Sequence, residues 1–166
     1  MSTIRPERPG DEPGIRAVHL ACFPGPAEAD LVDALRAAGR LTFSLVAEVD
    51  GTIVGHVAFS PVTASGAPNG IGMAPVAVAS SHRRQGIAAE LIRAGLDACR
   101  SAGFTWAVVL GNPAYYGRFG FQAATGFGLS DEYGGGPAFQ AMELWPGGVP
   151  VGAGLVRYAP EFAAFG

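Results

Sequence analysis

The hexapeptide Arg83-Arg84-Gln85-Gly86-Ile87-Ala88 has residue types and a position that suit the binding of a phosphate group. It lies between an apolar run at residues 73–79, typical of a buried strand, and a stretch at residues 88–102 whose apolar residues repeat with a helical period. Backbone N–H groups at a helix start are free to bind an anion, the helix dipole attracts one, and glycine lets it approach closely. Arg83 and Arg84 add positive charge, so this turn suits a pyrophosphate, although arginines before a helix and a glycine in a turn also occur by chance in many proteins.

Composition excludes several other chemistries. All 11 basic residues are arginines, so there is no lysine for a Walker A loop or a Schiff base. Three histidines and two cysteines stand at spacings unrelated to a zinc site, and no metal is expected. There is no Gly-x-Ser-x-Gly motif, and the Gly-x-Gly at residues 70–72 precedes a strand, which argues against a Rossmann site.

Charge and hydropathy argue against nucleic acid and membranes as partners. The formal net charge is -3, so the chain has no basic footprint for nucleic acid. No apolar stretch is long enough to cross a membrane, no signal peptide is evident, and we expect a cytoplasmic protein with free thiols at Cys22 and Cys99. The length of 166 residues predicts a single domain over residues 1–166, in which the Gly/Pro-rich residues 146–166 form an appendage.

The elements that must position the turn can be predicted from periodicity and turn residues. Asp50-Gly51 predicts a tight hairpin between two strands, Asp11 is the expected N-cap of the first helix, and Gly39 and Gly103 are expected to end the second and third. Residues 64–72 and 126–137 have the composition of turns and flexible loops. Helices are predicted at 11–23, 27–38, 88–102 and 112–120, and strands at 3–5, 43–49, 52–59, 73–79, 104–110, 121–124, 139–145 and 155–158.

Two motifs in this order resemble those of the GNAT superfamily of acyl-CoA-dependent N-acyltransferases. The superfamily has Q/R-x-x-G-x-G/A between its fourth strand and third helix, matched here by the hexapeptide, with Ala88 at the last position. It also has a short helix that ends in Y-x-x-x-G-F, matched by residues 116–121. The stretch LGNPAYYGRFGF and the later MELWPGG look more specifically like a group of small bacterial predicted acetyltransferases.

This resemblance implies a fold and a reaction. The implied fold is α/β: a central mixed, twisted sheet with helices on both faces, splayed between the fourth and fifth strands. The implied reaction is transfer of the acetyl group of acetyl-CoA to a primary amine that attacks directly within a ternary complex, without a metal. The acceptor is not identified by the sequence, but it is expected to bind at the loop after the first helix, at residues 66–70 and at residues 130–139. A homodimer and acyl groups other than acetyl are left open. A non-catalytic acyl-CoA-binding or regulatory module of the same fold is the alternative.

The resemblance also assigns residues. It implies that the backbone of Val76, Ala77 and Val78 pairs with the pantetheine arm, with an N–H near Val76 stabilising the oxyanion. The turn residues Arg83, Arg84, Gln85, Gly86, Ile87 and Ala88 would hold the pyrophosphate.

Two side chains further along the chain complete the implied site. Asn112 would reach a pantetheine amide, although an asparagine before Pro113 is equally explained as a helix cap. Tyr116 would protonate the leaving thiolate, since a phenol with a pKa near 10 is a suitable acid, and its alternative role is aromatic packing. The base that deprotonates the amine is left open among Glu48, His56, Glu143 and a chain of water molecules.

Overall fold

The fold is built on a nine-stranded mixed sheet, in a computed structural model that describes residues 2–165. The main strand order is β1-β2-β3-β4-β5-β8-β6, and β9 pairs with both β3 and β7. The strands are β1 (Thr3–Pro6), β2 (Phe43–Val49), β3 (Thr52–Ala64), β4 (Ala67–Val78), β5 (Trp106–Leu110), β6 (Gln122–Ala123), β7 (Leu129–Asp131), β8 (Phe139–Glu143) and β9 (Gly154–Arg157).

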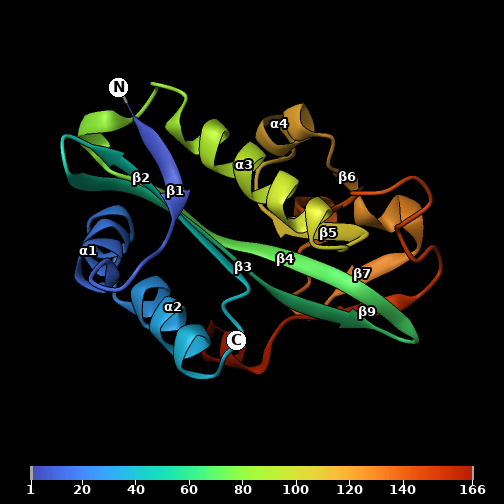
Figure 1. The fold of residues 1–166 in the computed structure, drawn as a ribbon. Coiled ribbons are helices and arrows are strands. Elements are labelled where there is room, and N and C mark those ends of the chain that lie inside the picture. Colours follow the sequence, from blue (N-terminus) through green and yellow to red (C-terminus); the bar gives the residue numbers. More distant parts are fainter. Residues whose placement is uncertain (1, 166) are drawn as a thin grey trace.

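Helices cover both faces of this sheet, as predicted (Figure 1). One face packs on α1 and α2, where Ile15 and Val32 contact the strand residues Val46 and Ala58. The other face packs on α3. The α-helices are α1 (Glu12–Cys22), α2 (Ala27–Ala37), α3 (Ile87–Ser101) and α4 (Pro113–Tyr116).

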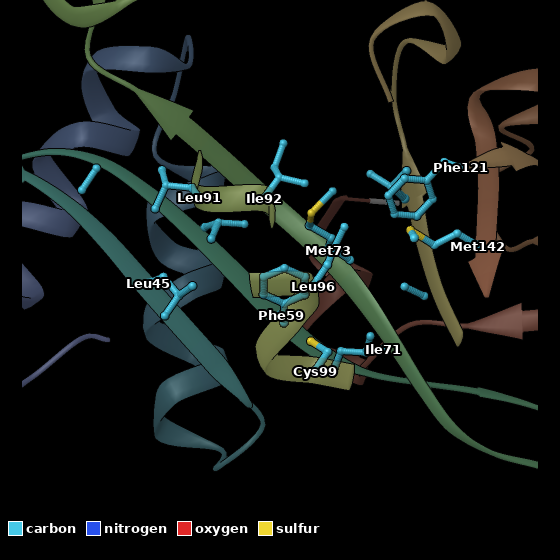
Figure 2. Packing of buried hydrophobic residues seen from close by; sticks show 14 of the residues in the cluster. Leu45, Phe59, Ile71, Met73, Leu91, Ile92, Leu96, Cys99, Phe121 and Met142 are labelled. Atoms are coloured by element: carbon cyan, nitrogen blue, oxygen red, sulfur yellow. The ribbon is translucent and has the colours of Figure 1, made fainter. Parts of the chain in front are cut away.

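The core under α3 depends on a close contact between helix and sheet (Figure 2). Gly95 lies directly over the ring of Phe59, where an added Cβ would overlap the ring carbons. Leu91, Ile92 and Leu96 surround this contact with fully or nearly fully buried side chains. The helical repeat at these positions is therefore a packing signal that the sequence identified correctly.

The central unit of strand, helix and parallel strand is confirmed. β4 pairs in parallel with β5 through Gly70, Ile71 and Gly72, whose partners are Trp106, Ala107 and Val108. The predicted hairpin is also confirmed, because Asp50 and Gly51 both have positive φ (49° and 77°) and join β2 to β3.

Three predictions about local structure are wrong. Residues 64–72 are not a loop: β3 runs to Ala64 and β4 begins at Ala67. Gly66 (φ 68°) does form the turn between these two strands, as predicted, but Gly70 is needed for packing, because a Cβ there would overlap the indole of Trp106. Asp11 does not cap α1 through its side chain, since its carboxylate accepts hydrogen bonds from Arg5 at 2.7 and 3.0 Å.

The third wrong prediction concerns residues 126–137, which are not a structureless loop. They contain β7, which pairs in parallel with β9. The final strands are also shorter than predicted or shifted by one residue: β6 and β8 are trimmed at their ends, and β9 starts one residue early.

Candidate functional site

The turn before α3 presents unpaired backbone N–H groups. Arg84 (φ 63°) and Gly86 (φ 79°) both have left-handed backbone conformations, and α3 begins at Ile87. Within residues 2–165, the N–H groups of Arg84, Gln85, Gly86, Ile87 and Ala88 donate no hydrogen bond to a protein acceptor. Five adjacent donors at the positive end of a 15-residue helix make a site that fits a pyrophosphate.

The side chains of this turn are mostly turned to solvent. Arg84 and Gln85 are exposed. Arg83 also has an exposed side chain, but it reaches back to the end of α1, where Nη2 lies 3.3 Å from Sγ of Cys22 and Nε lies 3.4 Å from the carbonyl of Val78. Arg83 therefore ties the turn to the end of α1 and to the end of β4.

The sheet opens next to this turn. Pairing between β4 and β5 ends at Gly72 and Val108, so the rest of β4 has no partner on its β5 side within the described chain. Val76, Ala77 and Val78 lie in this unpaired part, and β3 pairs with their other edge. Unpaired strand backbone of this kind can bind an extended amide-bearing chain as an added strand.

Asn112 is the N-cap of α4. Its Oδ1 accepts a hydrogen bond from the N–H of Ala114 at 2.9 Å, which is the capping role that the sequence left open beside a ligand role. The side chain is exposed, and its amide nitrogen donates to no other described residue. The cap therefore accounts for the oxygen of Asn112 and leaves the nitrogen available.

Tyr116 lies at the end of α4 in an aromatic cluster. Its ring centroid is 5.1 Å from that of Tyr115 and 6.1 Å from that of Phe121. Gly111 packs against the same ring so closely that an added Cβ would overlap it. Burial, with a smaller effect of Tyr115, raises the pKa of Tyr116, so the phenol keeps its proton at neutral pH.

A cavity of about 460 Å³ joins Tyr116 to the open part of β4. This volume is within the range of small-molecule sites. One side consists of β4 residues, Leu110 and Tyr116; the other comes from the end of α1, from α2 and from the C-terminal third of the chain. The lining residues are Phe23, Glu28, Leu31, Met73, Ala74, Pro75, Val76, Leu110, Tyr116, Tyr133 and Phe162.

None of the three side chains considered as bases lines this cavity. Glu48 lies on β2 beside the edge strand β1, where it accepts hydrogen bonds from Arg5 at 2.8 and 3.1 Å. Glu143 is exposed, and its Oε1 accepts from the N–H of Gly147 at 3.2 Å. His56 is fully buried and bonded to His19 at 2.8 Å.

The sequence analysis identified the far wall of the cavity only in part: it expected the acceptor at the loop after the first helix and at residues 130–139, but it named no side chain there and did not include the tail. Phe23 and Glu28 come from the end of α1 and the start of α2, while Tyr133 and Phe162 come from segments read as a loop and a tail. No local motif marks these residues, because they meet only through the packing of distant elements. Within residues 2–165 no group of three His, Cys, Asp or Glu could hold a metal ion, and no helix has the length and apolarity needed to cross a bilayer.

Comparison with known proteins gives consistent matches. The family model described as "Acetyltransferase (GNAT) family" matches residues 13–121. The uncharacterised N-acetyltransferase YhbS of Escherichia coli K12 is 43% identical over 165 residues, covering 98% of this chain and 99% of its own.

Solved structures agree with this match. The crystal structure of Escherichia coli YhbS in complex with CoA has a TM-score of 0.95 and 43% identity, and the alignment covers 99% of this chain and 93% of that one. A GNAT family acetyltransferase from Brucella melitensis in complex with acetyl-CoA has a TM-score of 0.82 and 40% identity, with 98% of each chain covered.

Proposed function

The chain belongs to the GNAT family of acetyltransferases, and on that premise we propose that it transfers the acetyl group of acetyl-CoA to a primary amine within a ternary complex. The observation that carries the proposal is the continuity of three features: the free N–H groups before α3, the unpaired backbone of β4, and the cavity that ends at Tyr116. The two relatives with bound CoA and acetyl-CoA support the choice of co-substrate.

Two parts of the chain bind the co-substrate: the turn before α3 and the unpaired backbone of β4. The N–H groups of Arg84 to Ala88 bind the pyrophosphate, with positive charge from Arg83 and Arg84. The backbone of Val76, Ala77 and Val78 pairs with the amides of the pantetheine arm, and the side-chain nitrogen of Asn112, which the cap leaves available, donates to one of them. This arrangement directs the thioester toward the cavity.

The reaction then needs no covalent enzyme intermediate. The neutral amine attacks the thioester carbonyl, and a backbone N–H near Val76 stabilises the oxyanion. The nitrogen loses one proton to a chain of water molecules that leads to solvent, since none of Glu48, His56 and Glu143 lines the cavity. When the carbon–sulfur bond breaks, the thiolate takes the phenolic proton of Tyr116, which is later replaced from solvent. The raised pKa of Tyr116 keeps that proton in place until the thiolate forms.

The test is release of CoA thiol in the presence of acetyl-CoA and a panel of primary amines, with acetylated product identified by mass spectrometry. Turnover that depends on both substrates supports the proposal. A protein that binds acetyl-CoA and acetylates no amine would instead be the non-catalytic module.

A further inference from the structure

The acceptor side of the cavity is apolar and carries a single negative charge. The β4 residues, Leu110 at the end of β5 and Tyr116 are assigned to the thioester. The remaining lining residues are Phe23, Glu28, Leu31, Tyr133 and Phe162. Three of them are aromatic, and one is aliphatic. An acceptor that fills this space therefore contacts rings and a leucine with most of its surface.

Glu28 is the only ionisable carboxylate among all the lining residues, and none of the arginines lines the cavity. The Glu28 side chain is half-buried in the first turn of α2. In the described part of the chain it forms no ion pair and no side-chain hydrogen bond, whereas its neighbour Asp30 is exposed and bonds Arg16 at 2.9 Å. Glu28 is thus an unneutralised charge beside an apolar surface.

This arrangement favours acceptors with a positive charge over acceptors that also carry a negative one. A cation that enters the cavity is attracted to Glu28, and the attraction is stronger than in water because the apolar walls lower the effective dielectric constant. An acceptor that also carries a carboxylate would place it near Glu28 with no arginine to neutralise it, at a cost in desolvation and repulsion.

We propose that the acceptor is a small aromatic or branched apolar amine without a carboxylate, whose ammonium group is attracted by Glu28 and whose hydrocarbon body packs on Phe23, Leu31 and Phe162. This inference rests on the proposed function, since it names the second substrate of the same site. It assigns Glu28 to substrate recognition, a role for which the sequence offered no motif.

Three amines test the proposal in the acetyl-transfer assay at fixed acetyl-CoA. 2-Phenylethylamine has both the ring and the ammonium, ethylamine lacks the ring, and phenylalanine adds a carboxylate to the first. We expect kcat/KM for 2-phenylethylamine to exceed the values for the other two by at least about tenfold. Equal kcat/KM for phenylalanine and 2-phenylethylamine would overturn the proposal, because it would show that the site does not discriminate against a carboxylate on the acceptor.

Variants of Glu28 test whether this residue causes the preference among the amines. Glu28→Gln should raise KM for 2-phenylethylamine about tenfold and leave KM for acetyl-CoA unchanged, and Glu28→Arg should shift the preference toward phenylalanine. Asp30→Asn, on the same helix but outside the cavity, should leave both KM values unchanged. An unchanged KM for the amine in Glu28→Gln would remove Glu28 from recognition.

Calorimetry with acetyl-CoA alone separates this proposal from the proposed function. If acetyl-CoA does not bind the wild-type protein, the proposed function fails. If acetyl-CoA binds and none of the three amines is acetylated, the assignment of the acceptor class is wrong while co-substrate binding stands.

Discussion

Nε2 of His19 lies 2.8 Å from Nδ1 of His56, and this contact joins α1 to β3 inside the protein. The chain continues from Nε2 of His56 to the hydroxyl of Ser44 at 2.7 Å, and that hydroxyl donates to Glu7 at 2.5 Å. Burial alone would raise the pKa of Glu7, but hydrogen bonds from Arg36 and Ser44 outweigh it and keep the pKa below its usual value. Glu7 is therefore ionised and accepts the proton of Ser44.

The direction of this chain fixes the tautomers. Since Ser44 donates to Glu7, it accepts from Nε2–H of His56, and Nδ1 of His56 then accepts from Nε2–H of His19. Nδ1 of His19 is left as a lone pair, which agrees with its having no hydrogen-bond partner in the described structure. Both histidines are therefore neutral, with their protons on Nε2.

Acid should destabilise the protein through these rings. Burial lowers the pKa of His19 to about 4, against a smaller opposing effect of Asp33, and burial, His19 and Arg36 lower the pKa of His56. Between pH 6.5 and 4 the unfolded chain binds more protons than the folded one, so stability falls as pH falls. His19 alone accounts for about 3 kcal/mol over this window.

Urea unfolding at pH values from 7.5 to 4 measures this loss. His19→Gln should be less stable at pH 7.5, but its free energy of unfolding should depend less steeply on pH. His82 is not part of this series of hydrogen bonds, so His82→Gln should keep the wild-type dependence on pH. An unchanged slope in His19→Gln would contradict the burial of His19 as a neutral imidazole with a lowered pKa.

Tyr116→Phe tests the proposed acid. The variant keeps the ring and its aromatic contacts and loses only the hydroxyl, so we expect kcat to fall by about 10²-fold or more, with little change in KM for acetyl-CoA. Steady-state kinetics with a working acceptor measure both. Full turnover in this variant would limit Tyr116 to packing.

Gly111→Ala should disturb the same tyrosine without touching its hydroxyl. The added Cβ would overlap the Tyr116 ring, so we expect the ring to move and kcat to fall. Gly117→Ala is the matched control, because Gly117 has helical φ (-55°) and no atom within 4 Å of the added Cβ. A loss of activity in the control equal to that in Gly111→Ala would argue against a specific contact.

Gly95→Ala tests the contact between α3 and the ring of Phe59, which Figure 2 shows among its buried neighbours. Alanine would gain up to about 1 kcal/mol in helix propensity, but overlap with the Phe59 ring should cost about 1–3 kcal/mol. A net loss of stability on thermal unfolding is therefore expected, with acetyl-CoA affinity unchanged. A more stable variant would mean that Phe59 has room to move aside.

The sequence predicted the parts of the fold that depend on local patterns. The hairpin at Asp50-Gly51, the helix over Leu91 to Cys99 and the cap at Asn112 each follow from turn residues or periodicity within one segment. It failed where distant packing decides the structure. Gly70 reads as a turn residue until Trp106 is known to cover it.

The candidate site also has one part that the sequence predicted and one part that only the structure shows. The turn at residues 83–88 could be found because the groups proposed to bind the pyrophosphate are consecutive backbone N–H groups. Glu28 could not be found, since its place beside Phe162 depends on how α2 meets the C-terminal segment. The proposed acceptor site thus depends on tertiary structure, while the proposed co-substrate turn depends on local sequence.

The most direct test of the proposed co-substrate site is a calorimetric titration of the protein with acetyl-CoA, compared with an Arg83→Ala/Gly86→Glu double variant. The double variant removes one charge and places a carboxylate among the free N–H groups, while Gly39→Glu controls for a charged residue at another left-handed glycine (φ 74°). We predict micromolar binding by the wild type and the control, and none by the double variant. Equal binding by all three proteins would contradict the assignment of the turn before α3 as the pyrophosphate site.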